Sequence, residues 1–432
     1  MFRQTLRDWE LILIDDGSTD ETSKILKEHR GCENIKIISQ KNKGLTATNN
    51  IALRISNSKY IMRLDADDYL DENALLVLSS TLDAKPQVGL VYPDYYLVDE
   101  QGEILEVVRR KKIGQEVELL DLPAHGACTM FRKECLLELG GYSERFRFQD
   151  GYELWIRFIE SFNPYNVNVP LFYYRQHHSN LTKNKDRILR TQAEIKRQFV
   201  KHRKNNKIPR VLAVVPVVKR PKYSPDDPFN LLAGKPLIWY TLSEASKSKM
   251  LDKIVVTTDD KAVFNYCRNF NKIVALSRPE HLARSSSKVG STLLYLLDTF
   301  KNNDGYAPDA VMVLYINTPL RRCFHIEKSI DTMAIFGVDS VISVNEEVDH
   351  FYQHHKYGLT AINKRKGISL EREALYKGNG AITLTRSALI TDGEILGKSI
   401  GHIAMLPEEG IRIRNNFEFW MAGKILTEWR NK

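Results

Sequence analysis

Acidic side chains follow two short apolar runs in the first half of the chain. The sequence DDGSTD begins at Asp15 and the sequence DADD begins at Asp65. A buried strand that ends in adjacent carboxylates is costly unless cations or hydrogen-bond donors meet them. Carboxylates two residues apart at a strand end can project to one side and hold Mg²⁺ or Mn²⁺ through oxygen ligands. Such an ion would neutralise a departing diphosphate.

Each acidic run also has a simpler interpretation. In the first, Ser18 or Thr19 could cap a helix whose first turn contains Glu21. That interpretation leaves Asp15 and Asp16 unexplained. The second run could be an acidic loop without a metal.

The elements that would position these residues alternate between strand-like and helix-like patterns. In the first half, strands are expected at Glu10–Ile14, Ile35–Ser39 and Tyr60–Leu64, with helices at Glu21–His29 and Leu45–Ile55. In the second half, strands are expected at Val211–Val217, Lys253–Thr257, Val311–Tyr315 and Ser340–Val344, with helices at Leu237–Lys247 and Val289–Phe300. This alternation predicts parallel sheets covered on both faces, with ligands at the carboxyl ends of the strands.

The composition is that of a folded protein with two or three domains. The chain has 432 residues, of which 43% are hydrophobic and 27% charged, so extensive disorder is excluded. Its longest apolar stretch is about eight residues, whereas a membrane-spanning helix needs roughly 20. The five cysteines are scattered and include no CxxC pair, which argues against a disulfide framework or a zinc site. We therefore expect a cytoplasmic protein.

The net charge of +9 is concentrated in residues 183–210, which contain eleven Lys or Arg and two acidic residues. This segment divides the chain into expected domains at 1–182 and 211–432. Ile188, Ile195 and Phe199 recur at helical spacing within it, which predicts a basic helix packed on the first domain, followed by a tether. The alternatives are peripheral contact with the inner face of an anionic membrane and RNA binding. We expect no nucleic-acid partner, because no recognition motif accompanies the charge.

Further motifs follow the two acidic runs: GGY at Gly140, QDGYELWIR at Gln149 and YRQH at Tyr174. In this order, over residues 4–182, they resemble the inverting family 2 glycosyltransferases, which have a GT-A fold. The resemblance implies a nucleotide-sugar donor, a sugar or lipid-linked glycan acceptor, and a Mg²⁺ or Mn²⁺ ion.

The same resemblance implies roles for individual residues. Asp150 would be the general base that deprotonates the acceptor hydroxyl, opposite the leaving diphosphate. Trp155 and Arg157 would pack and support the site. The remaining residues would contact the donor or its metal: Asp15 and Asp16 the nucleoside, Asp65 the ribose, and Asp67 and His177 the metal and diphosphate, with a structural role equally open for His177.

One departure from the family concerns the start of the chain. Members begin with a strand carrying a Pro-x-Tyr-Asn-like segment and a full helix before the stretch that matches Gln4–Glu10, and this sequence begins inside that helix. We therefore expect neighbouring strands to lose a ladder partner and expose their edges. Either the true start lies upstream, or the first domain has no ordinary donor site.

The second half contains a different ordered set of motifs: VLAVVP at Val211, LAGKPL at Leu232, TTDD at Thr257, RPEHLA at Arg278, TPLR at Thr318 and GNGAI at Gly378. Over residues 210–426 it resembles the acylneuraminate cytidylyltransferases, which activate acidic sugars with CTP on a Rossmann-like nucleotidyltransferase fold. Lys222 falls on the phosphate-contacting lysine of that family, and Arg321 and Asn379 are further candidates for ligand contacts.

Two motifs of the second half are altered. The phosphate-binding loop lacks both glycines of the family, and IRIR at Ile411 replaces the Ile-Asp-Ile-Asp pair that carries the divalent ion. Arg412 and Arg414 would repel a divalent cation, but a guanidinium can bind phosphate directly. The alternative is a decayed active site kept for binding. His350, His354 and His355 are expected on the surface.

The fold prediction is two nucleotide-binding three-layer α/β domains, GT-A-like and then Rossmann-like, joined by a basic helical linker. The predicted function is an inverting glycosyltransferase fused to a cytidylyltransferase-like domain in surface polysaccharide or glycolipid biosynthesis. The alternatives are a non-catalytic nucleotide- or sugar-binding scaffold, and a protein active mainly as a nucleotidyltransferase for an acidic sugar.

Overall fold

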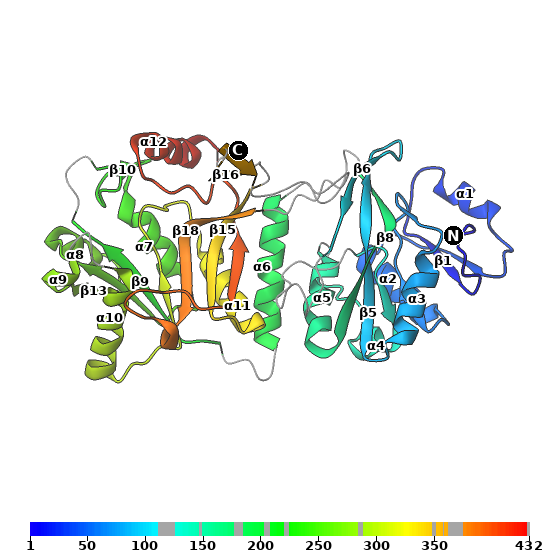
Figure 1. The fold of residues 1–432 in the computed structure, drawn as a ribbon, viewed down its shortest axis with the longest axis horizontal. Coiled ribbons are helices and arrows are strands. Elements are labelled where there is room, and N and C mark those ends of the chain that lie inside the picture. The colour runs from blue at the N-terminus through cyan, green and yellow to red at the C-terminus, as the bar shows by residue number, and fades with distance from the viewer. Residues whose placement is uncertain are drawn as a thin grey trace. The chain divides into compact units, whose positions relative to one another are not determined.

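The computed structural model describes residues 1–110, 126–146, 149–176, 185–202, 208–219, 224–283, 288–347, 351–356, 358–361 and 375–429. It divides the chain into two compact units (Figure 1). Unit 1 comprises Met1–Asn184 and His350–Glu373, and unit 2 comprises Lys185–Asp349 and Ala374–Lys432. Both units are α/β, as the sequence predicts.

Unit 1 is built around a six-stranded mixed sheet. Its strand order is β3-β7-β5-β8-β4, with β6 paired to β5. The pair β5 and β8 is parallel and the other pairs are antiparallel, so the prediction of an all-parallel sheet is wrong here. The strands are β3 (Tyr60–Met62), β4 (Tyr69–Leu70), β5 (Val88–Val98), β6 (Ile104–Val108), β7 (Met130–Arg132) and β8 (Asn163–Arg175).

Helices cover this sheet through two apolar clusters. One joins α3 to β5, β7 and β8, and the other joins α4 and α5 to β5 and β7. Trp155 and Phe158 of α5 are almost fully buried in the second cluster. The helices of unit 1 are α1 (Thr22–Glu28), α2 (Leu45–Ile55), α3 (Ala74–Ala84), α4 (Lys133–Glu138) and α5 (Asp150–Ser161).

Strands β1 (Leu11–Asp15) and β2 (Ile35–Ser39) form a separate two-stranded parallel sheet. Among the described residues, β1 pairs with β2 alone and β3 pairs with β7 alone, so each has one unpaired edge. Every residue of β3, and all of β1 except Asp15, is only partly buried. A short hairpin of β16 (Tyr352–His355) and β17 (Gly358–Ala361) also belongs to unit 1.

Unit 2 contains a seven-stranded mixed sheet in the order β13-β12-β9-β14-β18-β15-β19. The first four strands are parallel, as predicted, whereas β18 runs antiparallel to both of its neighbours. Six of the seven β9 residues are buried, as expected for an apolar run in the interior of a parallel sheet. The strands are β9 (Val211–Val217), β12 (Lys253–Thr258), β13 (Ile273–Ser277), β14 (Ala310–Val313), β15 (Ser340–Glu347), β18 (Leu375–Arg386) and β19 (Ile400–Ala404), and a small hairpin is formed by β10 (Leu231–Leu232) and β11 (Lys235–Pro236).

The helices of unit 2 are α6 (Lys185–His202), α7 (Leu237–Lys247), α8 (Lys261–Cys267), α9 (Glu280–Ala283), α10 (Val289–Asp304), α11 (Cys323–Phe336) and α12 (Asn416–Lys424), with a 3₁₀ turn at Ser387–Leu389 and a π-helical turn at Ile425–Trp429. Helix α11 stops at Gly337, whose φ of 66° is readily adopted only without a Cβ atom. In the part of the chain that the structure describes, no helix is long and apolar enough to cross a membrane.

The basic helix α6 packs on α11 of unit 2, not on the first domain as the sequence predicts (Figure 1). Ile195, Lys196 and Val200 form its buried face. The Lys196 amine donates to Thr332 Oγ1 at 3.0 Å, and Arg197 lies 3.5 Å from the buried carboxylate of Asp331. The helix is therefore attached to unit 2 by apolar and ionic contacts.

Candidate functional site

The first acidic run turns the chain at the end of β1. The Asp15 Oδ1 atom accepts a hydrogen bond from the backbone N–H of Ser18 at 2.8 Å, and this bond holds the pKa of Asp15 below its usual value. Helix α1 begins only at Thr22, and its N-cap Glu21 makes no side-chain cap bond. The alternative that Ser18 or Thr19 caps this helix is therefore wrong.

Asp16 fastens the loop that follows β2. Its Oδ1 accepts from Gln40 Nε2 and from the backbone of Lys43, and its Oδ2 accepts from the backbone of Gly44, each at 2.8 Å. Partial burial acts to raise the pKa of Asp16, but these hydrogen bonds outweigh it and lower that pKa. Asp16 is thus a fixed anion at the carboxyl end of β1.

The second acidic run places three carboxylates in different environments. Asp65 is paired with Arg63, with 2.9 Å between Oδ1 and Nε, and Asp67 is exposed. Asp68 is buried, and its Oδ1 accepts from the backbone N–H of Arg175 at 2.9 Å, while its Oδ2 is buried without a hydrogen-bond partner among the residues that the structure describes. Burial, helped by the charges of Asp67 and Asp65, raises the pKa of Asp68 to about 7.

Arg175 at the end of β8 holds this acidic loop in place. Its Nε donates to the carbonyl oxygen of Asp67 at 3.0 Å, and one Nη donates to the carbonyl oxygen of Glu100 at 2.6 Å. Its guanidinium also lies over the ring of Tyr69 at 5.7 Å. Arg175 lies in the YRQH motif, but its contacts with distant backbone atoms leave no signal in the sequence from which this role could be predicted.

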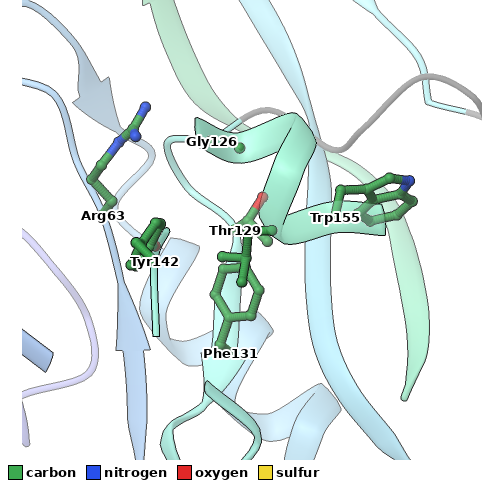
Figure 2. Close-up of a pocket in the computed structure, with 8 residues that line it drawn as sticks. Arg63, Gly126, Thr129, Phe131, Tyr142 and Trp155 are labelled. Carbon is green, nitrogen blue, oxygen red and sulfur yellow. The ribbon is translucent and has the colours of Figure 1, made fainter. Parts of the chain in front are cut away.

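A pocket in unit 1 is lined by Arg63, the partner of Asp65, and by the first turns of α5 (Figure 2). A Cβ atom on Gly126 would lie 2.7 Å from an Arg63 nitrogen, so glycine is what permits this close approach. The residues that line the pocket are Arg63, Gly126, Thr129, Phe131, Tyr142, Gly151, Leu154 and Trp155. The structure therefore brings together two of the predicted motifs, GGY and QDGYELWIR, with Arg63, which pairs with Asp65 of DADD.

Asp150 is the first residue of α5, next to the pocket residue Gly151. The residue before it, Gln149, has a φ of 60°, a strained conformation for a non-glycine residue that is concentrated at functional sites. The side chain of Asp150 and the whole of His177 lie outside the described residues.

The supporting roles predicted for Trp155 and Arg157 are confirmed. Trp155 is 4% exposed and packs edge-on against Tyr92. Arg157 donates to the carbonyl oxygens of Leu139 at 2.9 Å and Gly141 at 2.8 Å, and forms an ion pair with Glu153 of its own helix. It thereby links α5 to the GGY turn.

The predicted metal ligands can be tested only in part. Asp65 and Asp67 offer the hard oxygen donors that Mg²⁺ and Mn²⁺ prefer, and Asp67 is accessible. Within the described ranges, no group of three or more His, Cys, Asp or Glu side chains could hold a metal ion. The donor type fits a divalent ion, and Asp67 is the described residue best placed to hold one.

In unit 2, Arg321 and Asn379 face the interior. Arg321 is 1% exposed and donates to the carbonyl oxygen of Ala381 at 2.6 Å and to the hydroxyls of Thr318 and Thr241 at 2.9 and 2.8 Å. Burial lowers its pKa to about 9. Lys222 lies outside the described residues.

Asn379 belongs to a buried amide and hydroxyl network. Its Oδ1 accepts from the Ser343 hydroxyl at 2.5 Å and from the Ala381 backbone at 3.0 Å, and its Nδ2 donates to Asn345 Oδ1 at 3.1 Å. The structure therefore gives Arg321 and Asn379 protein partners in the interior of unit 2.

The two arginines of the IRIR motif differ. Arg414 is paired with Glu418, with 2.5 Å between Nη2 and Oε1, whereas Arg412 lies over the ring of Tyr315 at 5.7 Å. Asn317, which is not among the predicted site residues, has a buried Oδ1 without a hydrogen-bond partner in the described part of the chain. His354 and His355 are exposed on β16, as predicted, and His350 lies outside the described residues.

Comparison with known families agrees with this division. Residues 1–140 match the model of Glycosyl transferase family 2, and residues 225–333 match the model of Cytidylyltransferase. The chain joins a family 2 glycosyltransferase domain to a cytidylyltransferase-like domain.

Curated relatives match one half or the other. Chondroitin synthase of Escherichia coli is 36% identical over 103 residues, which are 24% of this chain and 15% of that protein. CMP-N,N'-diacetyllegionaminic acid synthase of Legionella pneumophila is 35% identical over 136 residues, which are 32% of this chain and 58% of the relative. UDP-Glc:alpha-D-GlcNAc-diphosphoundecaprenol beta-1,3-glucosyltransferase of Escherichia coli is 26% identical over 204 residues, which are 47% of this chain and 79% of the relative. The match thus spans 15% and 58% of the first two relatives.

Proposed function

We propose that unit 1 transfers a sugar, with inversion, from a nucleotide-sugar donor to a sugar or lipid-linked glycan acceptor. The observation that supports this most directly is the match of residues 1–140 to the family 2 glycosyltransferase model, together with Arg63, the partner of Asp65, and the first turns of α5 around one small pocket. In a single displacement, the carboxylates that bind the donor and the general base that activates the acceptor act on opposite sides of the sugar. Residues 1–182 would form this transferase domain.

In this proposal each residue has a defined task. Asp15 and Asp16 shape the nucleoside end of the site, and Asp65, held by Arg63, faces the ribose. Asp67, with His177, would hold Mg²⁺ or Mn²⁺, which when bound supplies positive charge to the diphosphate. Asp150 takes the proton of the acceptor hydroxyl as that oxygen attacks the sugar.

The proposed acceptor and location follow from the comparisons and the basic segment. One relative is named for transfer to a sugar linked to diphosphoundecaprenol, which supports a lipid-linked acceptor. The apolar face of α6 is buried on α11, so peripheral contact of residues 183–210 with an anionic membrane would use exposed basic side chains such as Lys201. We place the protein at the cytoplasmic face, in polysaccharide or glycolipid assembly.

For the second domain, residues 211–432, most of which lies in unit 2, we propose binding of CTP and an acidic sugar. A relative named as a CMP-sugar synthase and the cytidylyltransferase model support this ligand pair. The reaction that fits is cytidylyl transfer to the acidic sugar, detected by incubating the protein with CTP and N-acetylneuraminate and measuring CMP-sugar formation.

The transferase proposal is tested by Asp150→Asn in the full chain. A panel of UDP-sugars and oligosaccharide acceptors is screened for nucleotide release, and the active pair is used for kinetics. Loss of a general base should lower kcat by about 10²- to 10⁴-fold, with donor affinity retained. Asp8→Asn, at an exposed position, is the matched control. Turnover of Asp150→Asn equal to that of the wild type would contradict the assignment of the base.

A further inference from the structure

Arg412 is a cation with no acidic partner in the described part of unit 2. Its exposed side chain has one aromatic contact, with its guanidinium carbon 5.7 Å from the ring centre of Tyr315. The nearest acidic residues before and after Arg412 in the sequence already form ion pairs with other residues. Glu409 is buried against Arg322 and His325, and Glu418 is paired with Arg414.

The backbone around Arg412 fixes its position. The N–H of Ile413 donates to the carbonyl oxygen of Asn317 at 2.7 Å, which ties the IRIR segment to the loop after β14. Gly380, with a φ of 72°, lies beside the guanidinium, and a Cβ atom there would come within 3.3 Å of Nη1. The position of the Arg412 guanidinium is therefore set by the Tyr315 ring, by the hydrogen bond of Ile413 to Asn317, and by the absence of a side chain at Gly380.

Asn317 supplies a second unused polar group at the same point. Its Oδ1 is buried without a hydrogen-bond partner among the described residues. A buried amide oxygen without a partner is costly unless a ligand or water meets it. Because Asn317 is bonded to Ile413 through its carbonyl, its side chain and that of Arg412 come from adjoining segments.

This place is the carboxyl edge of the parallel strands. Tyr315 follows the end of β14 by two residues. Thr383 of the antiparallel strand β18 lies opposite Val313, so Gly380, three residues earlier in β18, lies beyond the carboxyl end of β14. In open α/β sheets this edge is where ligands bind.

We propose that Arg412 and Asn317 form a ligand site in unit 2, in which Arg412 binds a phosphate of a nucleoside triphosphate without a divalent cation and Asn317 Oδ1 accepts a hydrogen bond from a hydroxyl or amino group of the same ligand. The inference rests on the proposed binding of CTP by this unit. A guanidinium presents a planar fork of donors that matches phosphate oxygens. The adjacent Tyr315 ring restricts the orientation of that fork before the ligand arrives.

The chemistry of the donor set does not fit a metal at this place. Two arginines stand in the IRIR motif, and the described residues contain no cluster of three acidic, His or Cys side chains. A fixed positive charge and a divalent cation would compete for the same phosphate oxygens. The site therefore recognises the oxyanion through Arg412 itself.

The test is isothermal titration calorimetry of the full chain with CTP in EDTA. Wild-type protein should bind, Arg412→Ala should bind about ten- to a hundredfold more weakly, and Arg412→Lys should lie between them. Asn317→Asp, which introduces a like charge beside the phosphate, should also weaken binding. Arg268→Ala is the matched control, since Arg268 is exposed just after α8, where the chain returns toward the amino edge of the sheet.

Titrations with inorganic triphosphate and with N-acetylneuraminate distinguish the sources of the oxyanion. A loss in Arg412→Ala shared by CTP and triphosphate supports the proposal, whereas a loss confined to the acidic sugar overturns the phosphate assignment. CTP binding that requires Mg²⁺ and is unchanged in Arg412→Ala also overturns it, although the proposed function then stands. If wild-type protein binds no CTP with or without Mg²⁺, the proposed function of unit 2 fails as well.

Discussion

Replacement of Arg175 by methionine tests whether the acidic loop must be held for sugar transfer. The side chain donates to the carbonyl oxygens of Asp67 and Glu100, so the loop carrying Asp67 and the turn after β5 share one guanidinium. Methionine keeps an apolar stem beside Tyr69 but removes both bonds. The backbone N–H of Arg175 still donates to Asp68 in the variant.

The size of the effect follows from these bonds. Hydrogen bonds from a charged donor contribute about 1.5–3 kcal/mol each, but this side chain is only partly buried, so solvent reduces that contribution. We expect about 2 kcal/mol in total, which corresponds to roughly a 30-fold loss in kcat/KM for the donor sugar. Arg175→Lys should recover only part of it, because an ammonium does not reproduce the fork.

Two measurements check this expectation. The first is kcat/KM with the best UDP-sugar from the donor screen, compared with Arg30→Met, an exposed arginine after α1. The second is amide hydrogen exchange, which should quicken at residues 65–68 and 99–102 in Arg175→Met. If both kcat/KM and exchange match the wild type, Arg175 does not position the loop and the reasoning is refuted.

Two further predictions concern the stability of unit 2. Burial raises the pKa of Asp331 to about 7, so its unfolded form ionises first and stability should fall as pH rises from about 4 to 7, by up to about 4 kcal/mol. Asp331→Asn should remove this fall and be the more stable protein at pH 8 in urea unfolding; a wild-type curve flat over that range would contradict the assignment. Gly290→Ala would place a Cβ atom against the backbone oxygens of Thr391 and Asp392, within 2.9 Å of the latter, and should cost about 1–3 kcal/mol. Thermal unfolding compares this variant with Gly393→Ala, where the nearest atom is the flexible end of Lys288. Equal melting temperatures of the two variants would show that the backbone at Thr391 and Asp392 moves to accept the added methyl group.

Local pattern in the sequence was enough for many elements. The bounds predicted for β2, α2, β9 and α7 coincide with those of the structure, because apolar spacing and helix-forming runs are properties of adjacent residues. The candidate site of unit 1 was also largely accessible, since DADD, GGY and QDGYELWIR each lie in one short segment. The meeting of GGY and QDGYELWIR at one pocket is a property of the fold.

What the sequence could not give depends on distant partners. The amphipathic pattern of α6 shows that one face is covered but does not show which element covers it, and Lys196, a basic residue of this segment, is fully buried and bonded to Thr332 of α11. Arg175 donates to residues 75 and 108 positions away in the sequence. The sequence also gives no indication that Asn317 is hydrogen-bonded to the IRIR segment. The antiparallel insertion of β18 likewise has no local signal.

Because β1 pairs with β2 in a separate two-stranded sheet, the structure holds the first acidic run less firmly than the second. Asp67 is anchored to a broad sheet through β8, whereas Asp16 depends on a two-stranded ribbon whose apolar residues are only partly covered. Small ribbons open at low free energy, independently of the larger body beside them. A molecule that contacted both Asp16 and Asp67 would therefore stabilise the pairing of β1 with β2. The fraction of protein with this molecule bound would determine how often the two strands separate.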